Sequence, residues 1–485
     1  MDSLLQKFNE SRPDDPNTIS RKPIKEENGA INRFSLPYDA RDYTPQFYHM
    51  YQNRLNVLRE RVQVECAKKW DNGFKLNGKL VVKKEKVLDI QGVEPCWCVG
   101  TIYCEMKYKP NILEDVMNDT FGAPDLVKSY TDPDGSDEIM LEDESGRVLL
   151  VGDFIGSIPF ISGTVVGLLG MEAEAGTFQV LDICYPSEIP QKALPSPDTR
   201  EDEYVAFVSG LNINTSSPAR MIKLKLLQEY LMGDLSSDDR IAKIGKLIIC
   251  GNSIEFNSNE KNVGEVLKCL EDMGDFLANT LQTISVDIMP GMSDPSDKTL
   301  PQQPLNKALF KESLKPYFEH INDEILNLVT NPYNFQINGI NILATSGQNI
   351  DDIVKYIVPY LEKSTKEEVS SDDEDVDMDS QKFPEDTIEH RLDLMECTMK
   401  WQNIIPTAPD TLGCYPYTKE DPFILNEWPH IYIVSNQSSF ATKDIKLNGG
   451  KTTVKLITIP QFSQTGQIVL LNLKDLSTSI VNIEL

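Results

Sequence analysis

The first stretch of the chain with periodic apolar positions begins after Pro45. Before it, residues 1–43 are polar and rich in proline, asparagine and charge, and such a composition cannot bury enough apolar surface to fold by itself. We therefore expect a flexible N-terminal tail over residues 1–43. Within residues 44–75, apolar side chains recur at spacings of three and four, namely Tyr48, Tyr51, Leu55, Leu58, Val62 and Cys66. This spacing predicts an amphipathic helix.

Residues 76–190 have a different pattern, in which short β-rich runs alternate with glycines. The runs are VEPCWCVGTIYCEM, GRVLLVGDF, TVVGLLGMEAE and GTFQVLDICYP. About five short strands with glycine at the bends are typical of a small closed barrel of the oligonucleotide-binding (OB) type, with another small barrel or a meander as the alternative. Barrels that bind single strands use a basic groove, yet no Lys or Arg occurs between Arg147 and Lys192. The lysines at positions 79, 83, 84 and 86 fit a solvated strand face, so we predict a protein-docking module.

From residue 200 to residue 485, apolar strands alternate with helical patterns. The strand in EDEYVAFVSGLNIN precedes a helix that Ser217 caps, Pro218 opens and Gly233 ends. The strand IGKLIICGNSIEF, the helix NVGEVLKCLEDMGDFLANTL and the strand ISVDIMP come next. This alternation predicts a layered α/β domain with a largely parallel sheet, and any site should lie in the loops at the carboxyl ends of the strands.

The net charge of the chain argues against nucleic-acid binding as its main role. The formal net charge is −28 at pH 7, whereas phosphate binding needs clustered Lys and Arg. Part of this charge lies in EEVSSDDEDVDMDS, residues 367–380, which carries eight acids and no bases. Such self-repelling sequence predicts a disordered acidic insert over residues 365–382. Within it, Ser370 and Ser371 precede Asp-Asp-Glu-Asp and are candidate sites for an acidophilic kinase.

Cysteine usage indicates a reducing compartment. The nine cysteines are an odd number spread through predicted core elements, which favours reduced thiols over a disulfide framework. The chain contains neither an apolar run of about 18 residues nor a secretory signal, so we expect a cytosolic or nuclear protein. Cys96, Cys98 and Cys104 have no evident fourth ligand and are predicted to be buried thiols rather than a zinc site.

Two further polar signals indicate structure rather than metal binding. In TDPDGSDEIMLEDE, Gly135 falls at position 4 of a loop starting at Asp132, whereas a calcium loop has glycine at position 6, so we predict a polar turn. The histidines are His49, His320, His390 and His430. A site for two metal ions needs about eight His, Asp and Asn side chains, and His430 lacks nearby partners, which favours a hydrogen-bonded structural role.

The loops between Tyr204 and Leu485 resemble the motifs of calcineurin-like phosphoesterases in order and setting. Those motifs are Asp-x-His, Gly-Asp, Gly-Asn-His-Asp/Glu, an isolated His and Gly-His-x-His. The matching positions in this chain are Gly210, Asn212, Asn252, Met292, Ser293, Asp294, Ser346, Asn436 and Ser438. The resemblance implies a two-sheet α/β metallophosphoesterase-like domain over residues 200–485. Because two cations are held by a bridging carboxylate and several imidazoles, the same match implies an inactive site with no catalytic residue, metal or cofactor. Only Asp294 survives, as a predicted turn residue.

A narrower resemblance is carried by WQNIIPTAPDTLGCYPY, residues 401–417, with PGMSDPSD and TSGQNIDDI. These segments are similar to the B subunits (second, or small, subunits) of eukaryotic replicative DNA polymerases, most closely those of DNA polymerase delta, from the barrel to the carboxyl terminus. The resemblance implies a nuclear, non-catalytic scaffold for DNA replication and repair. It implies that the OB domain and the inactive phosphoesterase-like domain hold the cysteine-rich C-terminal domain of the catalytic subunit. A third, clamp-tethering subunit and a translesion polymerase are further implied partners.

Two other functions remain open from the sequence. One is an active metal-dependent phosphodiesterase or nuclease, as in the archaeal relatives that keep the full ligand set. The other is a single-stranded DNA-binding protein that uses the OB barrel. The missing histidines weigh against the first and the acidic charge weighs against the second.

Overall fold

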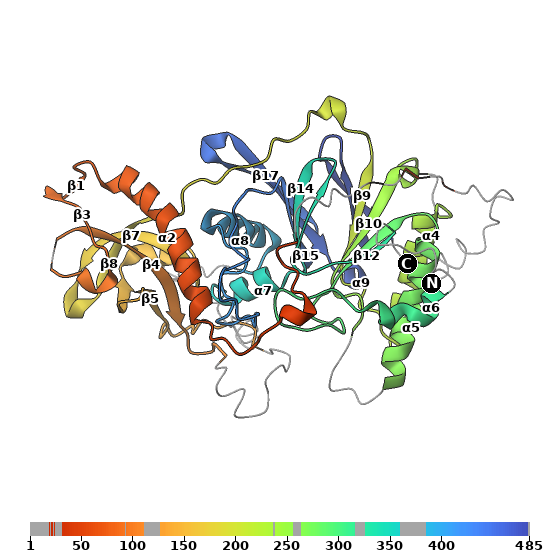
Figure 1. Ribbon diagram of the computed structural model, residues 1–485, viewed down its shortest axis with the longest axis horizontal. Helices are drawn as coiled ribbons and strands as arrows, with labels where there is room; N and C mark the ends of the chain where they lie inside the picture. Colours follow the sequence, from red (N-terminus) through yellow and green to blue (C-terminus); the bar gives the residue numbers. More distant parts are fainter. Residues whose placement is uncertain are drawn as a thin grey trace, which may run out of the picture. The chain divides into compact units, whose positions relative to one another are not determined.

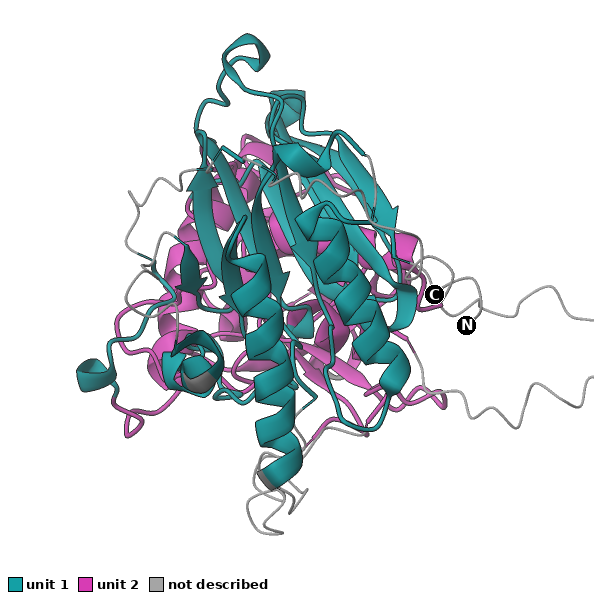
Figure 2. Cartoon of the chain, turned by 90° about the vertical axis from the view of Figure 1, so that its right-hand side faces the viewer, with its two compact units in different colours: residues 1–41, 191–348, 427–485 teal, residues 42–190, 349–426 magenta. Residues whose placement is uncertain are grey.

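The computed structural model describes residues 19, 21–22, 24, 32–92, 94–110, 127–235, 238–255, 263–315, 325–358 and 385–483. Figure 1 labels the helices and strands of the chain. The chain forms two compact units, each built from separate stretches of sequence (Figure 2). Unit 1 comprises residues 1–41, 191–348 and 427–485, and unit 2 comprises residues 42–190 and 349–426. The predicted acidic insert at 365–382, its Ser370 and Ser371, and His320 lie outside the described residues.

The first sheet of unit 1 has six strands in the order β12-β11-β10-β9-β18-β19. They are β9 (Tyr204–Val208), β10 (Ile244–Cys250), β11 (Ser285–Met289), β12 (Leu326–Leu328), β18 (Gln467–Asn472) and β19 (Thr478–Asn482). Strands β9 to β12 are mutually parallel, which confirms the predicted parallel arrangement. The late strand β18 pairs antiparallel with β9 and with β19.

The second sheet of unit 1 has five strands in the order β13-β14-β15-β17-β16. They are β13 (Tyr333–Ile337), β14 (Ile340–Thr345), β15 (Ile431–Gln437), β16 (Ala441–Leu447) and β17 (Thr452–Pro460). The two sheets share one apolar core, to which Phe207 and Ile248 contribute from the first sheet and Ile342 and Ile433 from the second. Strands covered on both faces are buried along their whole length, and every residue of β10 and β15 is buried.

Helices cover the other face of the first sheet. Among the described residues of unit 1, the α-helices are α4 (Pro218–Met232), α5 (Val263–Thr280), α6 (Lys311–Leu314) and α9 (Phe462–Thr465). Helices α4 and α5 share a second apolar core with the first sheet, and the two long helices of unit 1 lie in front of it in Figure 2. The predicted limits of α4 are confirmed, because Ser217 occupies the N-cap position and Gly233 ends the helix at φ 86°.

Five strands of unit 2 pair in a closed circuit. The strands of this unit are β1 (Lys75–Leu76), β2 (Lys79–Leu80), β3 (Val82–Lys83), β4 (Cys96–Glu105), β5 (Glu138–Glu142), β6 (Arg147–Val151), β7 (Val165–Glu172) and β8 (Phe178–Cys184). The pairings run β4-β5-β6-β8-β7 and return from β7 to β4. Strand β3 adds to β4, and β1 pairs with β2.

The four apolar runs of the OB-like region form β4, β6, β7 and β8, whereas β5 lies in the run that we interpreted as a polar turn. The turn itself is present, since the Gly135 N–H donates to the Asp132 carbonyl at 3.0 Å. Strand β5 was missed because its residues are mostly only half-buried, with Leu141 alone fully buried. Cys96, Cys98 and Cys104 are buried free thiols on β4, as predicted.

Helix α2 (Tyr48–Trp70) packs on β4, β7 and β8. The predicted apolar stripe is confirmed from Leu55 onward, since Leu55, Leu58, Val62 and Cys66 are buried. Tyr48 is an exception, with 61 % of its surface exposed, although Met50 in the same turn is fully buried.

Unit 2 is completed by α7 (Gln348–Lys355), from Asn349 onward, by α8 (Ile388–Trp401) and by the irregular segment that follows. In this division, residues 349–426 of the predicted 200–485 domain belong to unit 2. No helix in the described ranges is long and apolar enough to cross a membrane.

The second part of the predicted flexible tail packs on unit 1. Phe34 is fully buried. The Gln303 side chain accepts a hydrogen bond from the Leu36 N–H at 2.8 Å and donates one to the Phe34 carbonyl at 2.9 Å. Residues 32–36 therefore depart from the predicted flexible tail, because one aromatic side chain and one buried amide fix them in place.

Candidate functional site at the strand ends of unit 1

The positions that match phosphoesterase ligands follow the carboxyl ends of five strands in the two sheets of unit 1. Gly210 and Asn212 follow β9, Asn252 follows β10, and residues 292–294 follow β11. Ser346 follows β14, and Asn436 is the penultimate residue of β15. Because these strands are parallel neighbours within their sheets, their ends meet at one edge of the layered body.

Asn436 joins the two sheets at this edge. Its side-chain Nδ2 donates to the carbonyl of Ser346, the residue after β14, at 2.8 Å. The same Nδ2 donates to the carbonyl of Cys250, the last residue of β10, at 3.2 Å. Its backbone N–H donates to the Ser209 Oγ at 3.0 Å. The residue has φ 59°, a left-handed conformation that asparagine tolerates better than most residues. A buried amide therefore holds the two sheets together at the site.

Asp294 and Asn252 fasten the loop after β11 to the loop after β10. The two carboxylate oxygens of Asp294 accept from the Ile254 N–H at 3.0 Å and the Gly291 N–H at 2.7 Å. The Asn252 Oδ1 accepts from the Ser293 N–H at 3.1 Å. Burial raises the pKa of Asp294 to about 6, although the backbone hydrogen bonds act in the opposite direction.

Two glycines let these loops approach each other closely. Gly251 has φ 86°, and a Cβ at this position would overlap the Ser346 side chain. A Cβ at Gly291 would overlap both Asn252 and Ser346. The loops after β10, β11 and β14 are thus in direct van der Waals contact at the centre of the site.

The side chains of three predicted site residues do not join this network, although the backbone N–H of Asn212 donates to the Asn252 carbonyl at 2.9 Å. The Asn212 Nδ2 donates instead to the Ser463 Oγ of α9 at 3.0 Å. Met292 is 45 % exposed, and Ser438 is exposed beyond the end of β15. The structure therefore brings together six of the nine positions, namely Gly210, Asn252, Ser293, Asp294, Ser346 and Asn436.

The residues present do not fit a binuclear metal centre. Asp294 is the one carboxylate among the nine matched positions, and both its oxygens are occupied by backbone N–H groups. In the part of the chain that the structure describes, no group of three or more His, Cys, Asp or Glu residues is placed to hold a metal ion. The amides and hydroxyls at these strand ends hold loops together, and we derive no hydrolytic step from them.

His430 has the structural role predicted for it. Its Nδ1 accepts from the Asn341 N–H at 2.8 Å, and its Nε2 lies 2.9 Å from the Lys192 carbonyl. Burial lowers the pKa of His430, which favours the neutral ring that these two bonds require.

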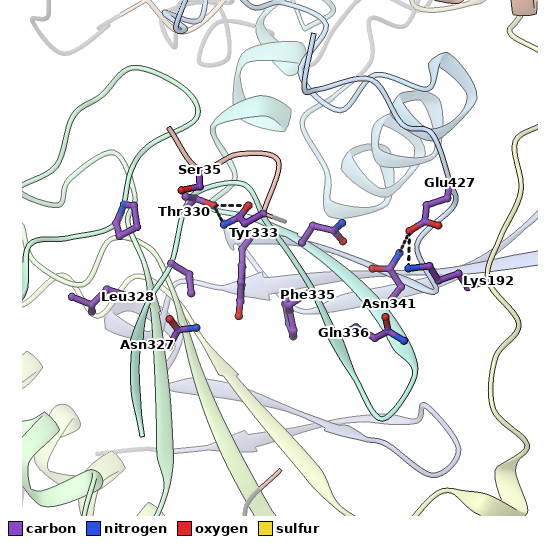
Figure 3. Close-up of a pocket in the computed structure, with 14 residues that line it drawn as sticks. Ser35, Lys192, Asn327, Leu328, Thr330, Tyr333, Phe335, Gln336, Asn341 and Glu427 are labelled. Carbon is purple, nitrogen blue, oxygen red and sulfur yellow. Dashed lines mark hydrogen bonds and ion pairs between the residues drawn. The ribbon is translucent and has the colours of Figure 1, made fainter. Parts of the chain in front are cut away.

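A separate cavity of about 240 Å³ lies in unit 1 beside β12 and β13. Figure 3 shows neutral side chains around it, including Asn327, Gln336 and Asn341, and an ion pair of Lys192 with Glu427 at 3.3 Å. Its lining contains no nucleophile paired with a base, so the cavity does not indicate catalysis.

Sequence reasoning missed Ser209, Gly251 and Gly291, because glycines and hydroxyls at strand ends are common in any α/β fold. A usable signal was the repeated asparagine, since Asn212, Asn252 and Asn436 all adopt positive φ in these loops.

Two family models match the chain. Residues 205–442 match the model for the B subunit of DNA polymerases alpha and epsilon. Residues 46–183 match the model described as the DNA polymerase delta subunit OB-fold domain. The second match assigns the closed strand circuit of unit 2 to an OB-fold domain.

Three relatives match over most of their length. The DNA polymerase delta small subunit of Saccharomyces cerevisiae is 57 % identical over 100 % of both chains. The DNA polymerase delta small subunit of Arabidopsis thaliana is 36 % identical, covering 95 % of this chain and 96 % of its own. The DNA polymerase delta subunit 2 of Drosophila melanogaster is 30 % identical, covering 91 % of this chain and 94 % of its own. The chain therefore belongs to the family of DNA polymerase delta small subunits.

Proposed function

We propose that this protein is the non-catalytic small subunit of DNA polymerase delta and acts as a scaffold in nuclear DNA replication and repair. The observation that carries the proposal is the 57 % identity over the full length of both chains with the yeast small subunit. The geometry of the strand ends supports it, because the groups at the matched positions connect loops and sheets.

Unit 1 fits a phosphoesterase-like body that has lost its metal site. Support comes from the two packed sheets and from the order of the five loops. Asn436 occupies the position of a motif histidine and bonds to two carbonyls, and Asn252 occupies the bridging position as a neutral amide. A neutral amide there lacks the negative charge with which a bridging carboxylate holds two cations, and its oxygen accepts a hydrogen bond from the Ser293 N–H. The closed pairing of β4 to β8 in unit 2 supports an OB barrel that docks proteins.

The partners that we propose are the cysteine-rich C-terminal domain of the catalytic subunit, a third subunit that tethers the sliding clamp, and a translesion polymerase with a similar catalytic tail. The net charge of −28 favours partner domains with basic surfaces, since opposite potentials speed encounter and fix orientation. We expect contact with DNA to be indirect.

Affinity purification of the tagged full-length protein from growing cells, followed by quantitative mass spectrometry, tests the assembly. The expected result is a family-B polymerase catalytic chain and a clamp-tethering subunit at matched amounts. Recovery of the protein without any polymerase chain, under conditions that keep other replication complexes intact, would contradict the proposal.

A second experiment separates the scaffold from the two other functions. The purified protein is incubated with manganese and a generic phosphodiester, bound metal is measured, and an active metallophosphoesterase serves as the positive control. We expect neither stoichiometric metal nor turnover, whereas both together would establish an active phosphodiesterase. Tight, salt-sensitive binding of single-stranded DNA by the free protein would instead favour a DNA-binding OB protein.

A further inference from the structure

Two cysteines from distant parts of the sequence lie together beneath α2. Cys66 is in the last turns of α2 and is fully buried, while Cys184 ends β8 and is 7 % exposed. Both belong to the apolar core of unit 2, with Val62 of the helix and Val99 of β4. Neither thiol is in a disulfide.

Gly167 on β7 accounts for their proximity. In the antiparallel pair of β7 and β8, Gly167 is directly opposite Cys184, and side chains at such positions point to the same face with Cβ atoms about 4.5–5.5 Å apart. A Cβ at Gly167 would overlap the Cys66 sulfur. The sulfur of Cys66 therefore occupies the space that a larger residue at position 167 would fill, immediately beside the Cys184 side chain.

The environments of the two thiols differ, and each thiol affects the pKa of the other. The neighbouring Cys184 side chain, together with burial, raises the pKa of Cys66. The Cys66 side chain lowers the pKa of Cys184, and the positive charge of Lys69 acts in the same direction, while burial and the negative charges of Asp182 and Glu65 oppose it. Lys69 is held at this place by Asp182, with 2.7 Å between its Nζ and the carboxylate.

We propose that Cys66 and Cys184 form a reversible disulfide when the protein meets a peroxide, which cross-links α2 to β8 of the OB domain. Cys184 reacts first, because 7 % of the residue is exposed whereas Cys66 is fully buried, and because its thiolate is the more favoured of the two. Its thiolate attacks one peroxide oxygen, the O–O bond breaks, and a sulfenic acid and one water form. The Cys66 sulfur then attacks the sulfenic sulfur, its proton leaves with the hydroxyl as a second water, and the S–S bond forms. The two thiols are oxidised by two electrons, and the peroxide is reduced to two waters.

This cross-link changes how firmly α2 is held. In the reduced protein the helix is held on β4, β7 and β8 by apolar packing and by polar contacts such as the bond from the Trp70 Nε1 to the Asp182 carboxylate at 3.2 Å. A covalent bond between the end of α2 and the end of β8 prevents the helix from separating and restricts the unfolded chain. Reduction by a dithiol reverses the change by thiol–disulfide exchange.

The experiment uses the full-length protein, reduced, freed of reductant and titrated with hydrogen peroxide. Free thiols are then blocked, and peptides are mapped without reduction by mass spectrometry. We expect near-stoichiometric linkage of the peptides that contain Cys66 and Cys184, loss of the linkage with dithiothreitol, and a higher melting temperature for the oxidised form. Cys66→Ala and Cys184→Val should each abolish both the linked peptide and the shift in melting temperature.

Cys98→Ser is the matched control, because Cys98 is a buried thiol on β4 whose sulfur hydrogen-bonds a backbone carbonyl, that of Val99, at 3.9 Å. This variant should cross-link as the wild type does. Melting curves of the reduced variants establish that each is folded. The proposal is overturned if the folded wild-type protein yields sulfinic acid at Cys184 without a linked peptide, or if both thiols stay unmodified under peroxide that oxidises exposed methionine.

Discussion

Arg54 is buried inside unit 2 and connects α2 to a segment more than 350 residues later. Its guanidinium pairs with Asp421 at 2.6 Å, and neither side chain has any exposed surface. It also donates to the carbonyls of Pro406 at 2.7 Å and Ala408 at 2.6 Å. Replacing Arg54 by methionine keeps much of the side-chain volume but leaves a buried carboxylate without its cation.

The expected loss follows from this geometry. Removing one partner of a fully buried ion pair costs about 3–5 kcal/mol of unfolding free energy, because the remaining charge is desolvated and unpaired. In a domain of about 150–250 residues each kcal/mol shifts the melting temperature by roughly 2–4 °C, so Arg54→Met should lower that of unit 2 by roughly 6–20 °C. Differential scanning fluorimetry measures the shift, and hydrogen exchange over residues 404–425 should rise with it.

Arg59 on the same helix provides a matched control. It pairs with Glu144 at 2.6 Å, but the two side chains are 18 % and 39 % exposed. Such a pair contributes at most about 1 kcal/mol, so Arg59→Met should have a small effect. The double variant Arg54→Met/Asp421→Leu removes both charges and should recover most of the loss. Equal melting temperatures for Arg54→Met and Arg59→Met would refute the reasoning.

Three other predictions concern the strand ends and the acidic insert. Gly251→Ala should lower the free energy of unfolding by about 1–3 kcal/mol, because a Cβ at φ 86° is strained and overlaps the neighbouring loop. Gly413→Ala is the control, because a Cβ there meets no atom within 4 Å. Its free energy of unfolding, measured by urea denaturation, should stay within about 0.5 kcal/mol of the wild-type value. Because the pKa of Asp294 is raised to about 6, its contribution to stability is full below its unfolded pKa of about 3.9 and is lost as the pH rises through 6. The melting temperature of the wild type should therefore fall relative to that of Asp294→Asn as the pH rises from about 4 to 6, and parallel curves would contradict the assignment. Phosphopeptide mapping from growing cells should find phosphate on Ser370 or Ser371, and two unmodified serines would remove that hypothesis.

The sequence predicted the elements whose signal is local. Helix α4 has a proline at its start and a glycine at its end, and the stripe of α2 repeats with helical period, so both were recognised. The buried ion pair of Arg54 was not recognised, because a charged residue on an amphipathic helix is normally solvated. Its partners come from a loop far along the chain, so the sequence around Arg54 does not indicate that pairing.

The candidate site was predicted as a set of positions and not as a network. Motif order located the loops after β9, β10, β11, β14 and β15, and it predicted Asp294 as a turn residue. The role of Asn436 was not predictable, since its two carbonyl partners belong to different sheets. Likewise, the contact of Cys66 with Cys184 depends on a glycine in a third element.

The order in which the two units use the chain limits how the protein can be made or divided. Unit 1 begins before unit 2, is interrupted by it twice, and ends after it, and the middle of its first sheet is completed only when β18 joins β9. During synthesis on the ribosome, β9 therefore waits for residues that emerge more than 250 positions later. The edge of β9 that β18 covers stays unpaired over that interval, and unpaired strand edges of this kind are prone to aggregation. Neither unit can be expressed as one continuous fragment, so dissection of this protein calls for circular permutation or co-expressed pieces.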